Sequence, residues 1–155
     1  MPDIPRLYSA IAEWMACMIF ILPFQKRFSK VKTGIIMAVM LFVQSGFMVL
    51  TEDVSLFFWL PCMIGAVLLM LFFIYASCSI EVTGAVYGVL IAFVVAEFMA
   101  SIEWQVVCYF GIAQSGVWWK EWSALILGYG LISVILYKIF HVHFPEDGQM
   151  EIGWK

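Results

Sequence analysis

The sequence predicts an all-α membrane protein, a polytopic bundle of about five transmembrane helices. Of its 155 residues, 65% are hydrophobic and 12% are charged, whereas a soluble domain carries about 25% charged residues. Five apolar runs also reach the length of about 20 residues that a helix needs to cross the hydrocarbon core of a bilayer. Strands of a membrane β-barrel would alternate polar and apolar residues, and these runs do not. The runs are therefore predicted to be helices.

The predicted spans are 7–24, 33–50, 56–78, 84–104 and 122–140. The first span stops near Pro23. The third contains Pro61 in its first turn, where a missing backbone N–H is tolerated. The stretch 104–121 is ambiguous, since it would either extend the fourth helix or lie in the outer interface. We assign residues 1–144 to a transmembrane domain. Residues 145–155 are then a cytoplasmic tail or the start of a following segment in a truncated chain.

Charges in the loops set the expected orientation. The first loop, 25–32, holds only basic charges, and the second, 51–55, holds only acidic ones. The basic residues are Lys26, Arg27, Lys30 and Lys32. Because short cytoplasmic loops carry an excess of Lys and Arg, the N-terminus is expected outside and the C-terminus in the cytoplasm. The expected location is the cell membrane.

The fourth predicted helix carries a stripe of small residues, one at every fourth position. Its members are Gly84, Gly88, Ala92, Ala96 and Ala100. In lipid, small residues let two helix backbones approach closely. The stripe therefore predicts close helix packing and a central position for this helix in the bundle.

A second, polar stripe runs along the same helix through Glu97, Ser101 and Gln105. Side chains four residues apart lie on one helix face. Glu103 lies six residues after Glu97, so at about 100° per residue it points elsewhere. We expect Glu97 to be buried and Glu103 to reach the headgroups from the helix end, so the two acids are not expected to form a catalytic pair.

Three polar residues are predicted to share one layer in the outer half of the bilayer. At about 1.5 Å per residue, Glu13, Gln44 and Glu97 lie roughly 9–10 Å below the outer ends of their helices. Two interpretations remain open. The residues form a hydrogen-bonded clamp with one or both acids neutral, because low dielectric disfavours charge, or they line a pocket for an external ligand or a proton. In the second case Arg6 would neutralise Glu13 from above. Ser101 and Gln105 complete the set of candidate ligand-binding residues.

Other chemistry finds little support in the sequence. Cys17, Cys62, Cys78 and Cys108 are widely spaced in apolar surroundings and are expected to be packing residues rather than metal or redox groups. His141 and His143, just past the fifth span, lack further ligands and are expected to be solvated at the interface. No phosphate-binding, nucleophile-elbow or zinc-protease motif is present. We therefore expect no cofactor, no metal and no catalytic residue. A net charge of −3 gives no reason to expect nucleic-acid binding.

Three segments resemble the N-terminal membrane region of bacterial sensor histidine kinases of the GHKL type. They are "MPDIPRLYSAIAEWMACMIFILPFQKRF", "TEDVSLFFWLPCMIGAVLLMLFFIY" and "AEFMASIEWQ". The resemblance covers roughly residues 1–150 and implies a polytopic sensor that forms a homodimer. It also implies further spans, a phospho-acceptor helix and an ATP-binding domain, none of which this sequence contains. Kinase activity, and contact with a response regulator, would thus require a downstream region.

Three functions follow as hypotheses. The first is a sensing domain that passes an extracellular or membrane signal to a cytoplasmic kinase region; its extracellular ligand is unknown. The second is a small transporter or ligand-binding membrane protein that uses an intramembrane carboxylate, the expected proton-coupling group. The third is a structural partner in a membrane complex.

Overall fold

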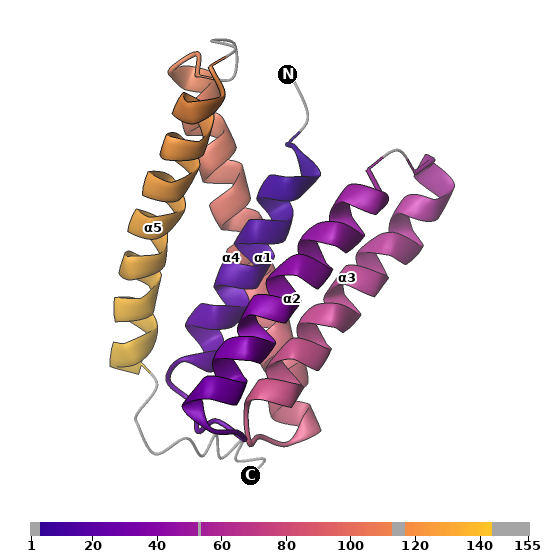
Figure 1. Ribbon diagram of the computed structural model, residues 1–155, viewed down its shortest axis with the longest axis vertical. Coiled ribbons are helices and arrows are strands. Elements are labelled where there is room, and N and C mark those ends of the chain that lie inside the picture. The colour runs from indigo at the N-terminus through magenta and orange to yellow at the C-terminus, as the bar shows by residue number, and fades with distance from the viewer. Residues whose placement is uncertain (1–3, 53, 113–116, 144–155) are drawn as a thin grey trace.

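The computed structural model describes residues 4–52, 54–112 and 117–143, which form helices and their connections (Figure 1). The helices are α1 (Arg6–Ile21), α2 (Lys30–Leu50), α3 (Leu56–Ser77), α4 (Val82–Tyr109) and α5 (Trp118–His143). Among the described residues, the only β-type pairing is an isolated bridge between Lys26 and Cys78. The prediction of an all-α fold is confirmed.

Four of the helices are long and apolar enough to cross a membrane. They are α2, the segment Phe57–Ser77 of α3, α4, and the segment Trp118–Ile139 of α5. Helix α1 has 16 residues, about 24 Å at 1.5 Å per residue, which is short of the hydrocarbon thickness of about 30 Å. Pro23, which lacks a backbone N–H, follows closely after its end. The prediction of apolar helices of membrane-spanning length is thus confirmed for four of the five segments.

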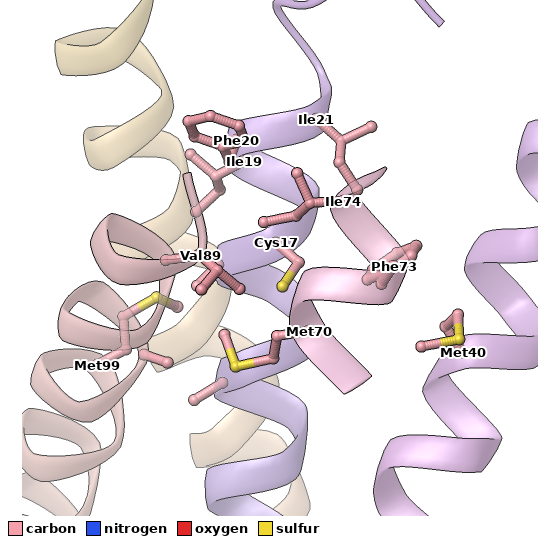
Figure 2. Close-up of a cluster of buried hydrophobic side chains, with 14 of the residues drawn as sticks. Cys17, Ile19, Phe20, Ile21, Met40, Met70, Phe73, Ile74, Val89 and Met99 are labelled. Carbon is pink, nitrogen blue, oxygen red and sulfur yellow. The ribbon is translucent and has the colours of Figure 1, made fainter. Parts of the chain in front are cut away.

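Helix α1 is the centre of the bundle, because it packs against each of the other four helices. Nine of its residues are buried, and its closest neighbour is α4, which lies behind it in Figure 1. Figure 2 shows Cys17 of α1 between Val89 of α4 and Ile74 of α3. The prediction that the fourth helix is central needs a correction: α1 occupies the middle, and α4 is its largest partner. The shortness of α1 is consistent with this place, since protein rather than lipid surrounds it.

The small-residue stripe of α4 faces α1. Gly88 is buried, and a Cβ added to it would overlap the ring of Phe20 on α1. Ala92, Ala96 and Ala100 are buried as well, whereas Gly84 is only partly buried. The missing side chains let the two helix backbones come close, as small residues do in lipid.

The outer surface of the bundle is strongly apolar. Large hydrophobic side chains of α2, α3, α4 and α5 point outward, and Phe57 is 83% exposed. A soluble monomer rarely exposes apolar patches larger than a few hundred Å². This surface is that of a protein surrounded by acyl chains.

The basic α1–α2 connection pairs with the α3–α4 connection at one end of the bundle. The Arg27 backbone N–H donates to the Ser77 carbonyl at 3.0 Å, and the Ser79 N–H donates to the Gln25 carbonyl at 3.0 Å. The Arg27 guanidinium lies 4.8 Å from the centre of the Tyr75 ring. The last turns of α5 lie at this same end (Figure 1). The cations of the first loop and the C-terminal end of α5 therefore share one side of the protein.

The fourth helix is longer than predicted. It runs from Val82 to Tyr109 rather than over 84–104. The ambiguous stretch therefore begins as helix, and Gly111 ends it with a φ of +64°, a conformation that favours glycine. Helix α5 begins at Trp118, four residues before the predicted start. Residues 113–116, within the same ambiguous stretch, lie outside the described residues.

Candidate functional site

A buried hydrogen bond between side chains joins α1 to α2. The Gln44 amide donates through Nε2 to Oε2 of Glu13. Glu13 is 1% exposed and Gln44 3%, so both side chains are removed from lipid as well as from water. The other oxygen of Glu13, Oε1, is buried and has no hydrogen-bond partner among the described residues. The pair is therefore only half satisfied.

The surroundings of Glu13 are apolar and tight. A narrow void beside it is lined by Trp14, Cys17, Met40, Gln44, Met70 and Phe73, and it is too small for a water molecule. The Trp14 indole donates to the Met37 carbonyl at 2.8 Å and so fixes this wall to α2. Arg6, expected to neutralise Glu13, directs its Nη1 at the Met63 sulfur, 3.9 Å away, and acts on Glu13 through its charge rather than through a hydrogen bond. Among the described residues, the only hydrogen bond to the Glu13 side chain comes from Gln44.

A second buried carboxyl group belongs to Glu103 on α4, which is 2% exposed. Its Oε2 fills the space in front of Gly128 on α5, where a Cβ would overlap it. Its Oε1 is buried and has no hydrogen-bond partner in the part of the chain that the structure describes. This carboxyl group thus sits at the contact of α4 with α5 and keeps unused hydrogen-bonding capacity.

Aromatic residues surround this second acid. The Tyr129 hydroxyl donates to the Tyr8 backbone carbonyl at 3.0 Å and so ties α5 to α1. The Tyr8 ring packs edge-on against Trp104, with 5.8 Å between ring centres. Tyr8 and Tyr129 are both buried. Helices α1, α4 and α5 therefore meet in one polar and aromatic cluster around Glu103.

The expected burial of the two acids of α4 is reversed. Glu97 is exposed, and Glu103 is buried. The reason is the helix face: Glu103 lies seven residues after Ala96, two helical turns on, and so shares the buried small-residue face. Glu97, one position past Ala96, is rotated outward by about 100°. The extension of α4 to Tyr109 also moves Glu103 away from the helix end. The seven-residue spacing between Ala96 and Glu103 is the sequence signal that would have identified Glu103 as buried.

The predicted polar layer is therefore brought together only in part. Glu13 and Gln44 are hydrogen-bonded, whereas Glu97 is exposed and acts on Glu13 only through its charge. Ser101 is partly exposed and Gln105 exposed, on the same side of α4 as Glu97. The candidate set thus divides into an internal pair and an external stripe.

A groove of about 400 Å³ lies between α1 and α5. Its walls are Trp14, Met15, Met18, Ile19, Leu22, Ser133, Val134, Tyr137 and Lys138. The volume falls within the range of about 300–1,000 Å³ that small-molecule sites occupy. Lys138 stands toward the end of the bundle that carries the basic loop. The lining is almost entirely apolar, and Lys138 is its one charged residue.

The described residues contain no cluster of side chains suited to metal binding. No group of three or more His, Cys, Asp or Glu side chains there is placed to hold a metal ion. Cys17 and Cys78 are buried, and Cys62 and Cys108 are partly buried. His141 and His143 belong to the last turn of α5, and their side chains lie outside what the structure describes.

No protein-family model matches the chain, and neither a curated protein nor a solved structure is significantly similar to it.

Proposed function

We propose that this chain is a signal-sensing domain of a multi-pass membrane protein, with its N-terminus outside and its C-terminal end toward the cytoplasm. In this proposal a bacterial cell membrane holds the domain, and α1 crosses it together with the four longer helices. A cytoplasmic histidine kinase region following the domain would receive the signal. The exposed cations of the loop 25–32, which lie at the same end of the bundle as the last turns of α5 (Figure 1), support this orientation.

The observation that carries the proposal is the half-satisfied Glu13–Gln44 pair on the central helix. A buried polar group without a partner costs about 1–3 kcal/mol, so an arrangement that completes its hydrogen bonds is favoured. Because α1 contacts all four other helices, a small movement of α1 at Glu13 would change the packing of each of them. A ligand changes such an equilibrium only if it binds one arrangement better than the other.

The polar and aromatic cluster around Glu103 supports a path along which the signal would pass from α1 to the C-terminal end of α5. Glu103 links α4 to Gly128 of α5, and Tyr129 links α5 to Tyr8 of α1. A shift of α1 against α4 would therefore also displace α5. The groove between α1 and α5 gives a membrane-soluble signal direct access to the same pair of helices.

The experiment joins residues 1–144 to a kinase core of known output and measures autophosphorylation in membranes. Candidate extracellular signals and changes in lipid composition are the inputs. Output is expected to respond to an input, and Gln44→Leu is expected to shift the basal output. Val39→Leu, at a lipid-facing position of α2, is the matched control and should behave as wild type. If the inserted, folded fusion answers no input and Gln44→Leu leaves its output unchanged, the proposal fails.

A transporter is the second candidate, favoured by two buried carboxyl groups that each keep one oxygen unpartnered. Intramembrane acids commonly serve in proton relays. The void beside Glu13, however, has no room for water, so a transporter would have to open a different conformation. Proton-driven uptake into vesicles that Glu13→Gln or Glu103→Gln abolishes would favour this candidate over the sensor.

A further inference from the structure

The groove between α1 and α5 is a place where lipid can reach the central helix. Among the described residues, α2 and α5 make no contact with each other, and the groove opens to the outside of the bundle. Trp14 stands in its wall, and the hydrogen bond from the indole to the Met37 carbonyl of α2 holds this ring in place. Met15 and Met18 continue the wall, and methionine side chains adapt to irregular apolar shapes. The groove therefore suits a flexible hydrocarbon chain.

The length of the groove matches one leaflet of a bilayer. On the α1 side its lining runs from Trp14 to Leu22, eight residues or about 12 Å at 1.5 Å per residue. Half of the hydrocarbon core is about 15 Å thick. Leu22 lies just before the basic loop 25–32, so the groove reaches from the middle of the membrane toward that loop. A single acyl chain of the leaflet on that side would lie along it.

Two cations stand at the end of the groove that meets the basic loop. Lys138 belongs to its lining and is exposed. The Lys26 ammonium lies 3.4 Å from the backbone carbonyl oxygen of Leu22, which also lines the groove. Arg27, the next residue of the loop, is instead placed over the Tyr75 ring of α3. Lys26 and Lys138 are thus the two ammonium groups that belong to this end of the groove.

We propose that the groove binds one acyl chain of an anionic phospholipid, whose phosphate group lies between Lys26 and Lys138. The chain alone gives little preference, because lipid tails are as apolar as the wall of the groove. Selection must then come from the head group, and basic pockets between membrane helices bind anionic head groups. Each cation favours such a head group by about fivefold. The inference does not rest on the sensing function.

The dimensions of the groove favour a lipid over a helix of another protein. A helix is about 10–12 Å across, so a length of 12 Å fills roughly 1,000 Å³. The groove holds about 400 Å³. The bilayer also supplies phospholipid at high concentration, which favours occupancy by mass action. A phospholipid chain is therefore the occupant that fits both the space and the charge.

Native mass spectrometry of the full chain, titrated in detergent with phosphatidylglycerol or with phosphatidylcholine of the same acyl chains, tests the head-group site. Wild type is expected to bind one phosphatidylglycerol at least about tenfold more tightly than phosphatidylcholine. Lys26→Gln combined with Lys138→Gln should lower this ratio below about threefold. Lys30→Gln combined with Lys32→Gln is the matched control, since it removes the same charge from exposed positions at the same end. Its ratio should stay within about twofold of wild type.

Three outcomes of this titration would overturn the proposal. A wild-type ratio near one would show that the groove does not select a head group. Equal losses in the two double variants would show attraction to the general charge of the surface. Tighter binding of a free fatty acid than of phosphatidylglycerol would assign the groove to a carboxylate ligand instead.

Filling the groove tests the part that the acyl chain occupies. Val134 lines the groove and is 58% exposed. Val134→Trp is expected to weaken phosphatidylglycerol binding at least about tenfold, because the ring takes the space of the chain. Ile126→Trp is the matched control: it lies on the same helix outside the lining, is 65% exposed, and should leave binding unchanged. Circular dichroism of both variants shows that they fold. Unchanged binding by folded Val134→Trp would contradict the proposal, because the lipid would then bind to the surface cations alone.

Discussion

The carboxyl group of Glu103 occupies the space that a side chain at position 128 would need. Glycine is the only residue type that leaves this space open at position 128, because any Cβ there would overlap Oε2 of Glu103. An acid on α4 and a glycine on α5 are thus fitted to each other. The fit allows a buried polar group to lie between two membrane helices without pushing them apart.

Gly128→Ala is expected to destabilise the protein by about 1–3 kcal/mol, the usual cost of overpacking a close-packed interior. The added methyl group must displace the Glu103 carboxyl or separate α5 from α4. Unfolding in a mixed detergent, followed by circular dichroism, measures the free energy of unfolding.

Two controls isolate the cause. Gly130 lies two residues further along α5, on roughly the opposite face of the helix at about 100° per residue. A Cβ there would meet no atom within 4 Å, so Gly130→Ala should be neutral or slightly stabilising, as Ala is the better helix former. In a Glu103→Ala background, Gly128→Ala should lose most of its cost, because neighbouring substitutions couple. A cost that stays the same with Glu103 removed would refute the fit.

Gln44→Leu is expected to cost about 1–3 kcal/mol of stability, since it leaves both oxygens of the buried Glu13 without a donor. Replacing both partners by Leu removes the unsatisfied groups, so the double variant should be closer to wild type than Gln44→Leu alone. The measurement is the free energy of unfolding of wild type, Glu13→Leu, Gln44→Leu and the double variant. A double variant that is less stable than either single variant would show that the pair contributes more than it costs.

The sequence predicted the parts of the fold that depend on composition and run length. Long apolar runs fix helices and their approximate limits, and the layer that contains Glu13 and Gln44 followed from counting residues along two helices. The end of α4 was harder to place, because the stretch from Val106 to Phe110 is apolar and no polar residue marks an end before Gly111, which takes up a positive φ. Helix ends in apolar sequence carry few polar signals.

Burial within the bundle was less accessible from sequence. In a soluble protein a polar side chain marks the outside of a helix, but in lipid both faces of α4 are apolar, and polarity does not separate inside from outside. The sequence prediction therefore buried Glu97 and exposed Glu103, the reverse of what the structure shows. The small residues of the helix face that holds Ala96 and Glu103 nevertheless marked the buried side. The central position of α1 depends on contacts between distant segments, which no local pattern contains.

Gly88→Ala is expected to destabilise the contact between α1 and α4, because the new Cβ would overlap the buried ring of Phe20. The overpacking cost of about 1–3 kcal/mol is partly offset by the helix preference for Ala over Gly, about 1 kcal/mol. A Cβ at Gly46 of α2 meets no atom within 4 Å, so Gly46→Ala measures the preference alone. Thermal unfolding of both variants gives the difference. Equal melting temperatures would mean that Phe20 moves aside without loss.

Cys78, in the connection between α3 and α4, should react with thiol reagents slowly at neutral pH and faster in alkali. Burial raises the pKa of its thiol to about 11, although Lys26 and Arg27 nearby act to lower it. The thiolate is the reactive form, so below this pKa the rate should rise about tenfold per pH unit. The measurement is the labelling rate from pH 7 to 10 in a variant whose other cysteines are replaced by alanine.

Lys26→Gln provides the test of the electrostatic part. The Lys26 side chain is exposed, so its replacement should leave the packing around Cys78 intact while removing one of the two cations that favour the thiolate. The pKa of Cys78 should then rise further, and labelling at a given pH should slow. Glu52→Gln, at the other end of the bundle, is the matched control and should leave the rate unchanged. A Lys26 variant that labels faster than wild type would indicate that the loop pairing, rather than charge, protects the thiol.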